Sequence, residues 1–151
     1  MRAGGESVSS GGETILVSAC LLGVECNHRG EGRSAPAVEA LAAGARLIPI
    51  CPEVVGGLPT PRPAAEVGAD RRVRTAAGED VTEFYERGAR HAVQVAIAAG
   101  VKRAVLKARS PSCGCHQIYD GTHRHVLVDG EGLTAAALRE AGVQVVSEED
   151  L

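Results

Sequence analysis

Aromatic side chains are almost absent from this sequence of 151 residues, which has no tryptophan, one phenylalanine and two tyrosines. Hydrophobic residues still make up 44% of the chain, so a core has to be built from Ala, Val, Leu and Ile. This length is typical of one domain. We expect residues 13–151 to form a single domain and the Gly/Ser-rich residues 1–12 to be a disordered N-terminal extension.

Segments that would direct the chain to a membrane are also missing. Residues 1–12 contain no apolar stretch of the signal-peptide type, and no apolar run approaches the roughly 20 residues that cross a bilayer. The sequence has no long basic run and a net charge of -3, which disfavours a duplex nucleic acid as partner. We therefore expect a cytoplasmic protein, with reduced thiols and with neither a membrane nor a duplex as partner.

Short apolar runs that alternate with helical patterns predict the fold. The expected strands cover residues 14–18, 46–50, 102–107 and 143–147, and the expected helices cover 36–43, 81–99 and 133–141. A small hairpin is expected within 65–76, and minor strands at 117–119 and 125–128. This order predicts an α/β domain with a mainly parallel sheet, flanking helices and a small hairpin excursion.

Prolines constrain two segments of this scheme. Pro49 lies inside an expected strand, which places that strand at a sheet edge or Pro49 at a bulge. Prolines at alternate positions near the end of residues 51–63 predict a stiff extended loop there.

The cysteines indicate where ligands bind. There are five, an odd and widely spaced set that does not favour a disulfide framework. Cys20, Cys51 and Cys113 each follow the carboxyl end of an expected strand, and such ends share one edge of a parallel sheet. We predict that these three thiols meet there. Three thiolates are typical of a metal centre with one open position, either zinc or a [4Fe-4S] cluster.

Neighbouring residues allow two interpretations each. Glu53 is either an acid/base group or a capping or ion-pairing residue, with Arg62 as its partner. Ser110 either orients a ligand or caps the following turn. Cys26 is a loop thiol of open role. Cys115 with the following histidine resembles part of a zinc site, but no second ligand pair is near in sequence, so we interpret Cys115 as an additional thiol.

A series of motifs, in order, resembles the TudS-like thiouracil desulfidases. They are residues 17–23 (VSACLLG), 51–53 (CPE), 57–63 (GLPTPRP), 78–82 (GEDVT), 107–114 (KARSPSCG) and 118–121 (IYDG). The resemblance extends from residue 15 to 149, and it is the combination that is specific. The chain departs from the family at residues 26–30, which read CNHRG, and at Cys115, where another residue type is usual.

The resemblance implies a Rossmann-like domain whose oxygen-sensitive [4Fe-4S] cluster is held by Cys20, Cys51 and Cys113. The fourth iron would bind the sulfur of a thiolated pyrimidine of the 2- or 4-thiouracil type, a small-molecule base or nucleoside. Hydrolysis without redox change would then release hydrogen sulfide. By motif, Glu53 and Ser110 are the candidate acid/base and substrate-orienting residues.

Two alternatives remain open at this point. The first alternative to a desulfidase is a non-catalytic zinc- or iron-sulfur-binding module. The second is an enzyme that uses a cysteine thiolate without metal. In the second case Cys113 would be activated by Lys107 or Arg109.

Overall fold

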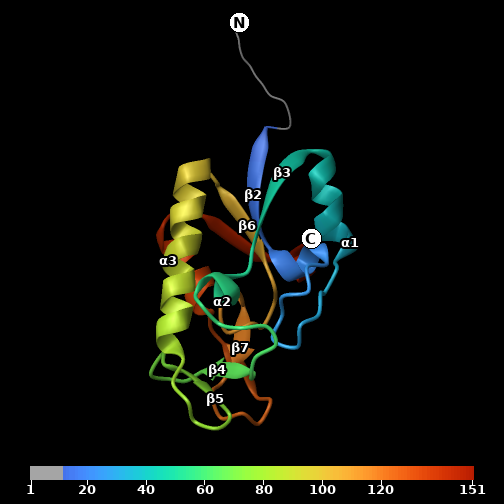
Figure 1. The fold of residues 1–151 in the computed structure, drawn as a ribbon. Coiled ribbons are helices and arrows are strands. Elements are labelled where there is room, and N and C mark those ends of the chain that lie inside the picture. The colour runs from blue at the N-terminus through green and yellow to red at the C-terminus, as the bar shows by residue number, and fades with distance from the viewer. Residues whose placement is uncertain (1–11) are drawn as a thin grey trace, which may run out of the picture.

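Four parallel strands form the central sheet of the protein, which the computed structural model describes over residues 12–151. They are β2 (Glu13–Ser18), β3 (Ala45–Ile50), β6 (Arg103–Leu106) and β9 (Gln144–Ser147), side by side in the order β3-β2-β6-β9. The predicted parallel sheet is confirmed (Figure 1). Nearly all of the extension that we expected to be disordered lies outside the described residues.

Both faces of this sheet are buried, as the continuous apolar strands indicate. Ile15 and Val17 of β2 pack on one face with Val38 of α1 (Pro36–Glu39). Leu16 packs on the other face with Ala92 and Leu138, which come from α3 (Thr82–Ala99) and α4 (Leu133–Glu140). Figure 1 shows α1 and α3 on opposite sides of the strands. The fold is a three-layer α/β arrangement.

The helices agree with the predicted positions to within a few residues. Only the first half of the expected helix at 36–43 is α-helical, and its second half is the 3₁₀ helix η2 (Ala40–Ala43). Gly100 ends α3 in the left-handed conformation at φ 67, which glycine adopts without strain. In the described part of the chain, no helix combines the length and the apolar character that crossing a bilayer requires.

Two small antiparallel pairs lie outside the main sheet. The predicted hairpin is β4 (Ala65–Val67) with β5 (Val73–Thr75), and the minor pair is β7 (Gln117–Tyr119) with β8 (Leu127–Asp129). β8 begins two residues later than expected. His125 has a φ of 60, which is incompatible with an extended strand.

The proline-containing segments differ in outcome. Pro49 lies on β3, which has β2 as its one partner in the sheet, so the edge-strand prediction is confirmed. The extended loop predicted for residues 51–63 is wrong at its start, because the one-turn helix α2 (Pro52–Val55) follows β3 directly. Pro52 occupies the first helical position, where its fixed φ favours the helix and its missing N–H is not needed.

Candidate active site

Cys20 is placed by the 3₁₀ helix η1 (Ala19–Leu22), which continues directly from β2. Gly23 ends this turn with a φ of 88, and its N–H donates to the carbonyl of Cys20. The N–H of Arg33 donates to the same carbonyl at 2.7 Å. Two backbone N–H groups therefore fix the carbonyl of Cys20, and its side chain is buried at the carboxyl end of β2.

Cys51 occupies the N-cap position of α2, at the carboxyl end of β3. Its extended backbone redirects the chain from strand to helix, and Glu53 falls in the first helical turn with its side chain turned inward. The short helix missed by the sequence analysis is thus the element that places the thiol and the carboxylate side by side.

Cys113 is placed by a turn that Ser110 organises. The Ser110 hydroxyl oxygen accepts hydrogen bonds from the N–H groups of Ser112 at 3.1 Å and Cys113 at 3.0 Å. The Ser110 carbonyl accepts from the N–H of Gly114 at 2.9 Å. Ser110 therefore caps this turn, as one of its two interpretations proposed, and it also lines the cavity described next.

The three strand-end cysteines lie around one cavity of about 460 Å³ at the carboxyl edge of the sheet. Cys20, Cys51 and Cys113 line it together with both predicted catalytic residues, Glu53 and Ser110. The position, beside the ends of β2 and β6, is the crevice in which open parallel sheets bind ligands. The structure thus brings together every site residue that the sequence analysis named. Their chemical roles stay predictions.

A fourth thiol, Cys26, lines the same cavity. It is buried, and its carbonyl accepts a weak hydrogen bond from the Cys51 thiol at 3.5 Å. Burial, and after it the neighbouring Cys51, raises the pKa of Cys26 to about 12. The sequence analysis left this residue without a role. Its one signal was its place in the loop that follows the first strand-end cysteine.

Glu53 lies in a buried network that holds both of its carboxylate oxygens. Arg62 Nε donates to Oε1 at 2.8 Å, and the Ser112 hydroxyl donates to Oε2 at 3.0 Å. The side chains of Arg62 and Glu53 are 3% and 11% exposed. Burial, and after it Glu53, raises the pKa of the adjacent Tyr85 phenol. The ion pair with Arg62 was one of the two interpretations of Glu53, whereas the hydrogen bond from Ser112 and the position of Tyr85 were not predicted.

The buried thiols are neutral at pH 7 when no metal is bound. Burial, followed by the proximity of Cys51, raises the pKa of Cys20 to about 11, and burial raises that of Cys113 to about 12. Metal coordination removes the thiol proton, so such groups are inert as nucleophiles yet serve as ligands.

The cations proposed to activate Cys113 are engaged elsewhere. Lys107 Nζ pairs with Glu148 at 3.2 Å. The Arg109 guanidinium pairs with both carboxylate oxygens of Glu149 at 3.0 and 2.8 Å. Neither cation is positioned to stabilise a Cys113 thiolate, which disfavours catalysis by that thiolate without metal.

The donor set fits a cluster with one open corner. Three thiols from three strand ends, with no disulfide among them, converge on a cavity large enough for a small ligand beside them. Soft thiolate ligands select iron–sulfur clusters or zinc, and a cubane held by three cysteines keeps one iron without a protein ligand.

Known proteins match this chain over almost its whole length. A family model described as 2-thiouracil desulfurase matches residues 15–150. A Bacillus subtilis (strain 168) protein, described as uncharacterized protein YbbK, is 40% identical over 146 residues, 91% of this chain and 97% of that protein. A solved structure described as [4Fe-4S]-dependent thiouracil desulfidase TudS is 47% identical, with a TM-score of 0.86, over 92% of this chain and 93% of that one. All residues that line the cavity lie within 15–150.

Proposed function

This chain belongs to the 2-thiouracil desulfurase family, a family of enzymes, and from that premise we propose that it removes sulfur from a thiolated pyrimidine with a [4Fe-4S] cluster. The observation that carries the proposal is the convergence of Cys20, Cys51 and Cys113 on one cavity in a chain 47% identical to TudS. These three residues would hold the cluster. The substrate would be a small base or nucleoside, acted on in the cytoplasm, where thiols stay reduced.

The overall reaction we propose is a hydrolysis. The oxygen of one water replaces the sulfur on the ring carbon, and the sulfur leaves with two protons as hydrogen sulfide, so no electrons are gained or lost. When bound, the cluster supplies a Lewis-acidic iron with an open position, which draws charge away from the carbon–sulfur bond. The side chains of the cavity supply the proton transfer and the orientation.

Glu53 is the general base in this proposal. Arg62 and Ser112 each donate to one of its oxygens, which fixes the carboxylate at the cavity wall and leaves each oxygen able to accept one more hydrogen bond. A water held there gives its proton to Glu53 as it attacks the ring carbon, and Glu53 returns the proton to the departing sulfur.

Orientation of the pyrimidine falls to residues at other walls of the cavity. Ser110 lies there beside Cys113, and its hydroxyl oxygen accepts two backbone N–H groups and lies 3.0 Å from the Ser112 hydroxyl oxygen. Because Ser112 gives its own proton to Glu53, Ser110 donates to Ser112, and it would have to turn this hydroxyl proton away from Ser112 to donate to a ligand. Tyr119 and His125 also line the cavity and pack edge to face with centroids 6.0 Å apart. They offer ring surfaces against which a flat base can pack.

Anaerobic reconstitution tests the proposal. We expect the loaded protein to contain one cubane per chain and to release sulfide from 2- or 4-thiouracil. Cys113→Ser should lose iron, acid-labile sulfide and activity together. Glu53→Gln should keep the cluster, and its turnover should fall roughly 100- to 10,000-fold, which is the rate enhancement that a general base typically contributes.

Glu86→Gln, an exposed carboxylate of α3, is the matched control and should behave as the wild type. The cluster assignment fails if Cys113→Ser keeps its full iron content. The role of Glu53 fails if Glu53→Gln turns over at the wild-type rate. Colourless protein with zinc in the three-cysteine site would replace the enzyme with the zinc-binding module.

A further inference from the structure

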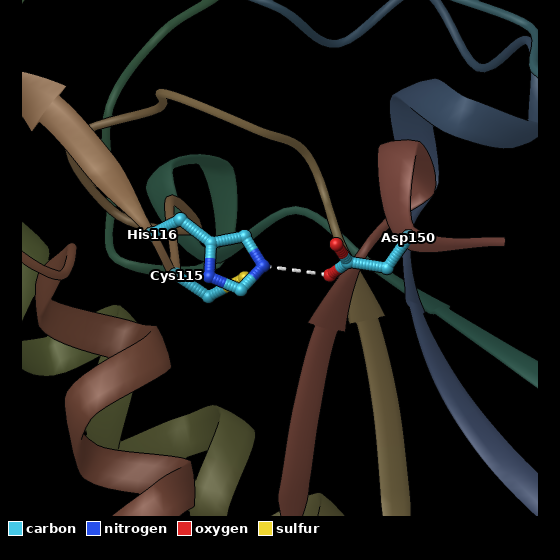
Figure 2. Close-up of side chains that lie close together, drawn as sticks. All are labelled: Cys115, His116 and Asp150. Atoms are coloured by element: carbon cyan, nitrogen blue, oxygen red, sulfur yellow. Dashed lines mark hydrogen bonds and ion pairs between the residues drawn. The ribbon is translucent and has the colours of Figure 1, made fainter.

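A second group of metal-ligating side chains lies outside the cavity, formed by Cys115, His116 and Asp150. One ligand atom from each, sulfur, imidazole nitrogen and carboxylate oxygen, lies within 4.8 Å of the other two. Figure 2 shows the His116 ring directed at the Asp150 carboxylate, with the Cys115 sulfur behind the ring. His116 Nε2 and Asp150 Oδ2 are 2.7 Å apart.

Strand pairing is what brings these residues together. Cys115 and His116 follow the turn after β6, and Asp150 belongs to the 3₁₀ helix η3 (Glu148–Asp150) after β9. β6 and β9 are neighbours in the sheet and run parallel, so their carboxyl ends emerge side by side. The missing second ligand partner of the Cys115–His116 pair therefore comes from the far end of the chain, beyond the reach of a local motif.

The carboxylate of this group is held in place by the backbone. Asp150 Oδ2 also accepts the N–H of Ser147 at 2.8 Å, as part of a capping box at the start of η3. Cys115 is partly buried and packs against the core cluster between the sheet and α3. Packing and the backbone thus hold two of the three donors, and the third, His116, has a side chain 62% exposed.

The donor set matches a borderline divalent cation. Zinc binds thiolate at about 2.3 Å and imidazole or carboxylate at about 2.0–2.2 Å, which puts tetrahedral ligand atoms roughly 3.3–3.8 Å from one another. The His116 and Asp150 atoms, 2.7 Å apart, have to separate by roughly 0.6–1.1 Å to admit the ion, and Cys115 has to move slightly closer. The exposure of His116 and of Asp150, at 62% and 36%, leaves a path for entry and a place for water as fourth ligand.

Other uses of this cysteine fit the contacts less well. Cys115 does not line the active-site cavity, so it is not placed to accept sulfur from the substrate. Within residues 12–151, no hydrogen bond joins its thiol to His116, so the three residues do not form a nucleophilic triad. The nearby carboxylates Glu148 and Glu149 pair with Lys107 and Arg109, which leaves this cluster as the ligand set.

We propose that Cys115, His116 and Asp150 form a surface site for Zn²⁺, separate from the three-cysteine cavity. Binding replaces the Cys115 S–H bond with a sulfur–zinc bond and releases one proton to solvent, with no change of oxidation state. The ion joins η3 to the loop that carries Cys113. It therefore ties the end of the chain to one wall of the active site.

The test uses the cluster-loaded protein, equilibrated anaerobically with zinc, dialysed and analysed for zinc and iron. We expect one zinc per chain in addition to the iron. Cys115→Ser and His116→Ala should each lose that zinc and keep their iron. His91→Ala, an exposed histidine of α3, is the matched control and should retain both metals.

X-ray absorption at the zinc edge locates the ion independently of the variants. We expect one sulfur at about 2.3 Å and nitrogen or oxygen ligands at about 2.0–2.2 Å. Three sulfurs per zinc would put the ion among the active-site cysteines and overturn the proposal. Wild-type protein that retains no zinc, or Cys115→Ser that retains as much as the wild type, would overturn it as well.

Discussion

Arg62 is the residue on which the cavity wall depends most. Its guanidinium donates to Glu53 Oε1 at 2.8 Å, to the Cys26 carbonyl at 2.9 Å and to the Pro59 carbonyl at 3.2 Å. A further contact at 3.9 Å reaches the sulfur of Cys51. One buried side chain thus joins the loop after η1, the helix α2 and the proline-rich loop. A planar group with five donors is suited to this, and a lysine is not.

Replacing Arg62 with methionine should lower the free energy of unfolding by about 3–5 kcal/mol, because it leaves the Glu53 carboxylate buried without its partner. Urea denaturation of the cluster-free, reduced protein measures the change. The free energy of unfolding of Arg62→Lys should lie between those of the wild type and Arg62→Met. Lysine keeps the positive charge but loses the planar guanidinium with its several donors.

The matched control is Arg139→Met. Arg139 makes a similar pair with Glu131 but is 56% exposed, so its loss should cost less than about 1 kcal/mol. Equal losses at the two positions would contradict the assigned importance of the Arg62–Glu53 pair.

At the level of elements, the packing of α2 on α3 decides where Cys51 and Glu53 lie. The two helices approach so closely at Gly88 that an added Cβ would lie 2.0 Å from the carbonyl oxygen of Pro52. Gly56, at the end of α2, meets the Phe84 carbonyl oxygen at 2.1 Å in the same way. The atoms that an added Cβ would meet belong to the backbone and not to a flexible side chain. Neither overlap can therefore be relieved by a small side-chain movement.

Gly88→Ala should therefore push α2 away from α3. Alanine favours a helix over glycine by about 1 kcal/mol, but the overlap with the Pro52 backbone outweighs that gain. We expect a net loss of about 1–3 kcal/mol in urea denaturation and fewer iron atoms per chain after reconstitution, because Cys51 moves with α2.

Gly44→Ala is the control, since nothing lies within 4 Å of an added Cβ there and the residue has a negative φ. It should leave stability and iron content nearly unchanged. A Gly88→Ala protein with wild-type stability and iron content would show that the α2–α3 approach is not as tight as described.

On the scale of the whole molecule, the proposed cluster ligands tie three distant segments together at one edge. Cys20 follows the central strand β2, Cys51 follows the edge strand β3, and Cys113 follows β6 on the other side of β2. Anything that binds the folded arrangement and not the unfolded chain stabilises the fold by mass action. The cluster is therefore expected to stabilise the molecule as well as to act on substrate.

Removing the cluster should lower the melting temperature. For a chain of this size, each 1 kcal/mol of lost stabilisation lowers Tm by about 2–4 °C. Anaerobic thermal unfolding followed by circular dichroism, before and after chelation of the iron, measures the shift. Cys51→Ser should start at the low value and show no further shift.

Cys115→Ser, in zinc-free buffer, should keep the full shift, because that thiol lies outside the cavity. A melting temperature that does not respond to the cluster would mean that the three segments are already held by the protein alone.

Local patterns determined most of the architecture before any contact was known. The apolar runs of β2 and β6 and the helical spacing of α3 were found within a few residues, because period and turn residues are properties of neighbouring positions. The parallel order of the strands then placed Cys20, Cys51 and Cys113 at one edge by topology alone. The ordered motifs resemble one family, and the family-model match and the 47% identical TudS structure show that the chain belongs to it.

Tertiary structure alone decided which side chains meet around those thiols. Contacts between segments far apart in sequence place Cys26 in the cavity wall and α2 at the end of β3. Such contacts also supply the hydrogen bonds from Arg62 and Ser112 to Glu53. The clearest case is Cys115 and His116, whose partner Asp150 comes from beyond β9. Residue spacing along the chain cannot predict this contact, because the contact forms only when neighbouring parallel strands bring their carboxyl ends together.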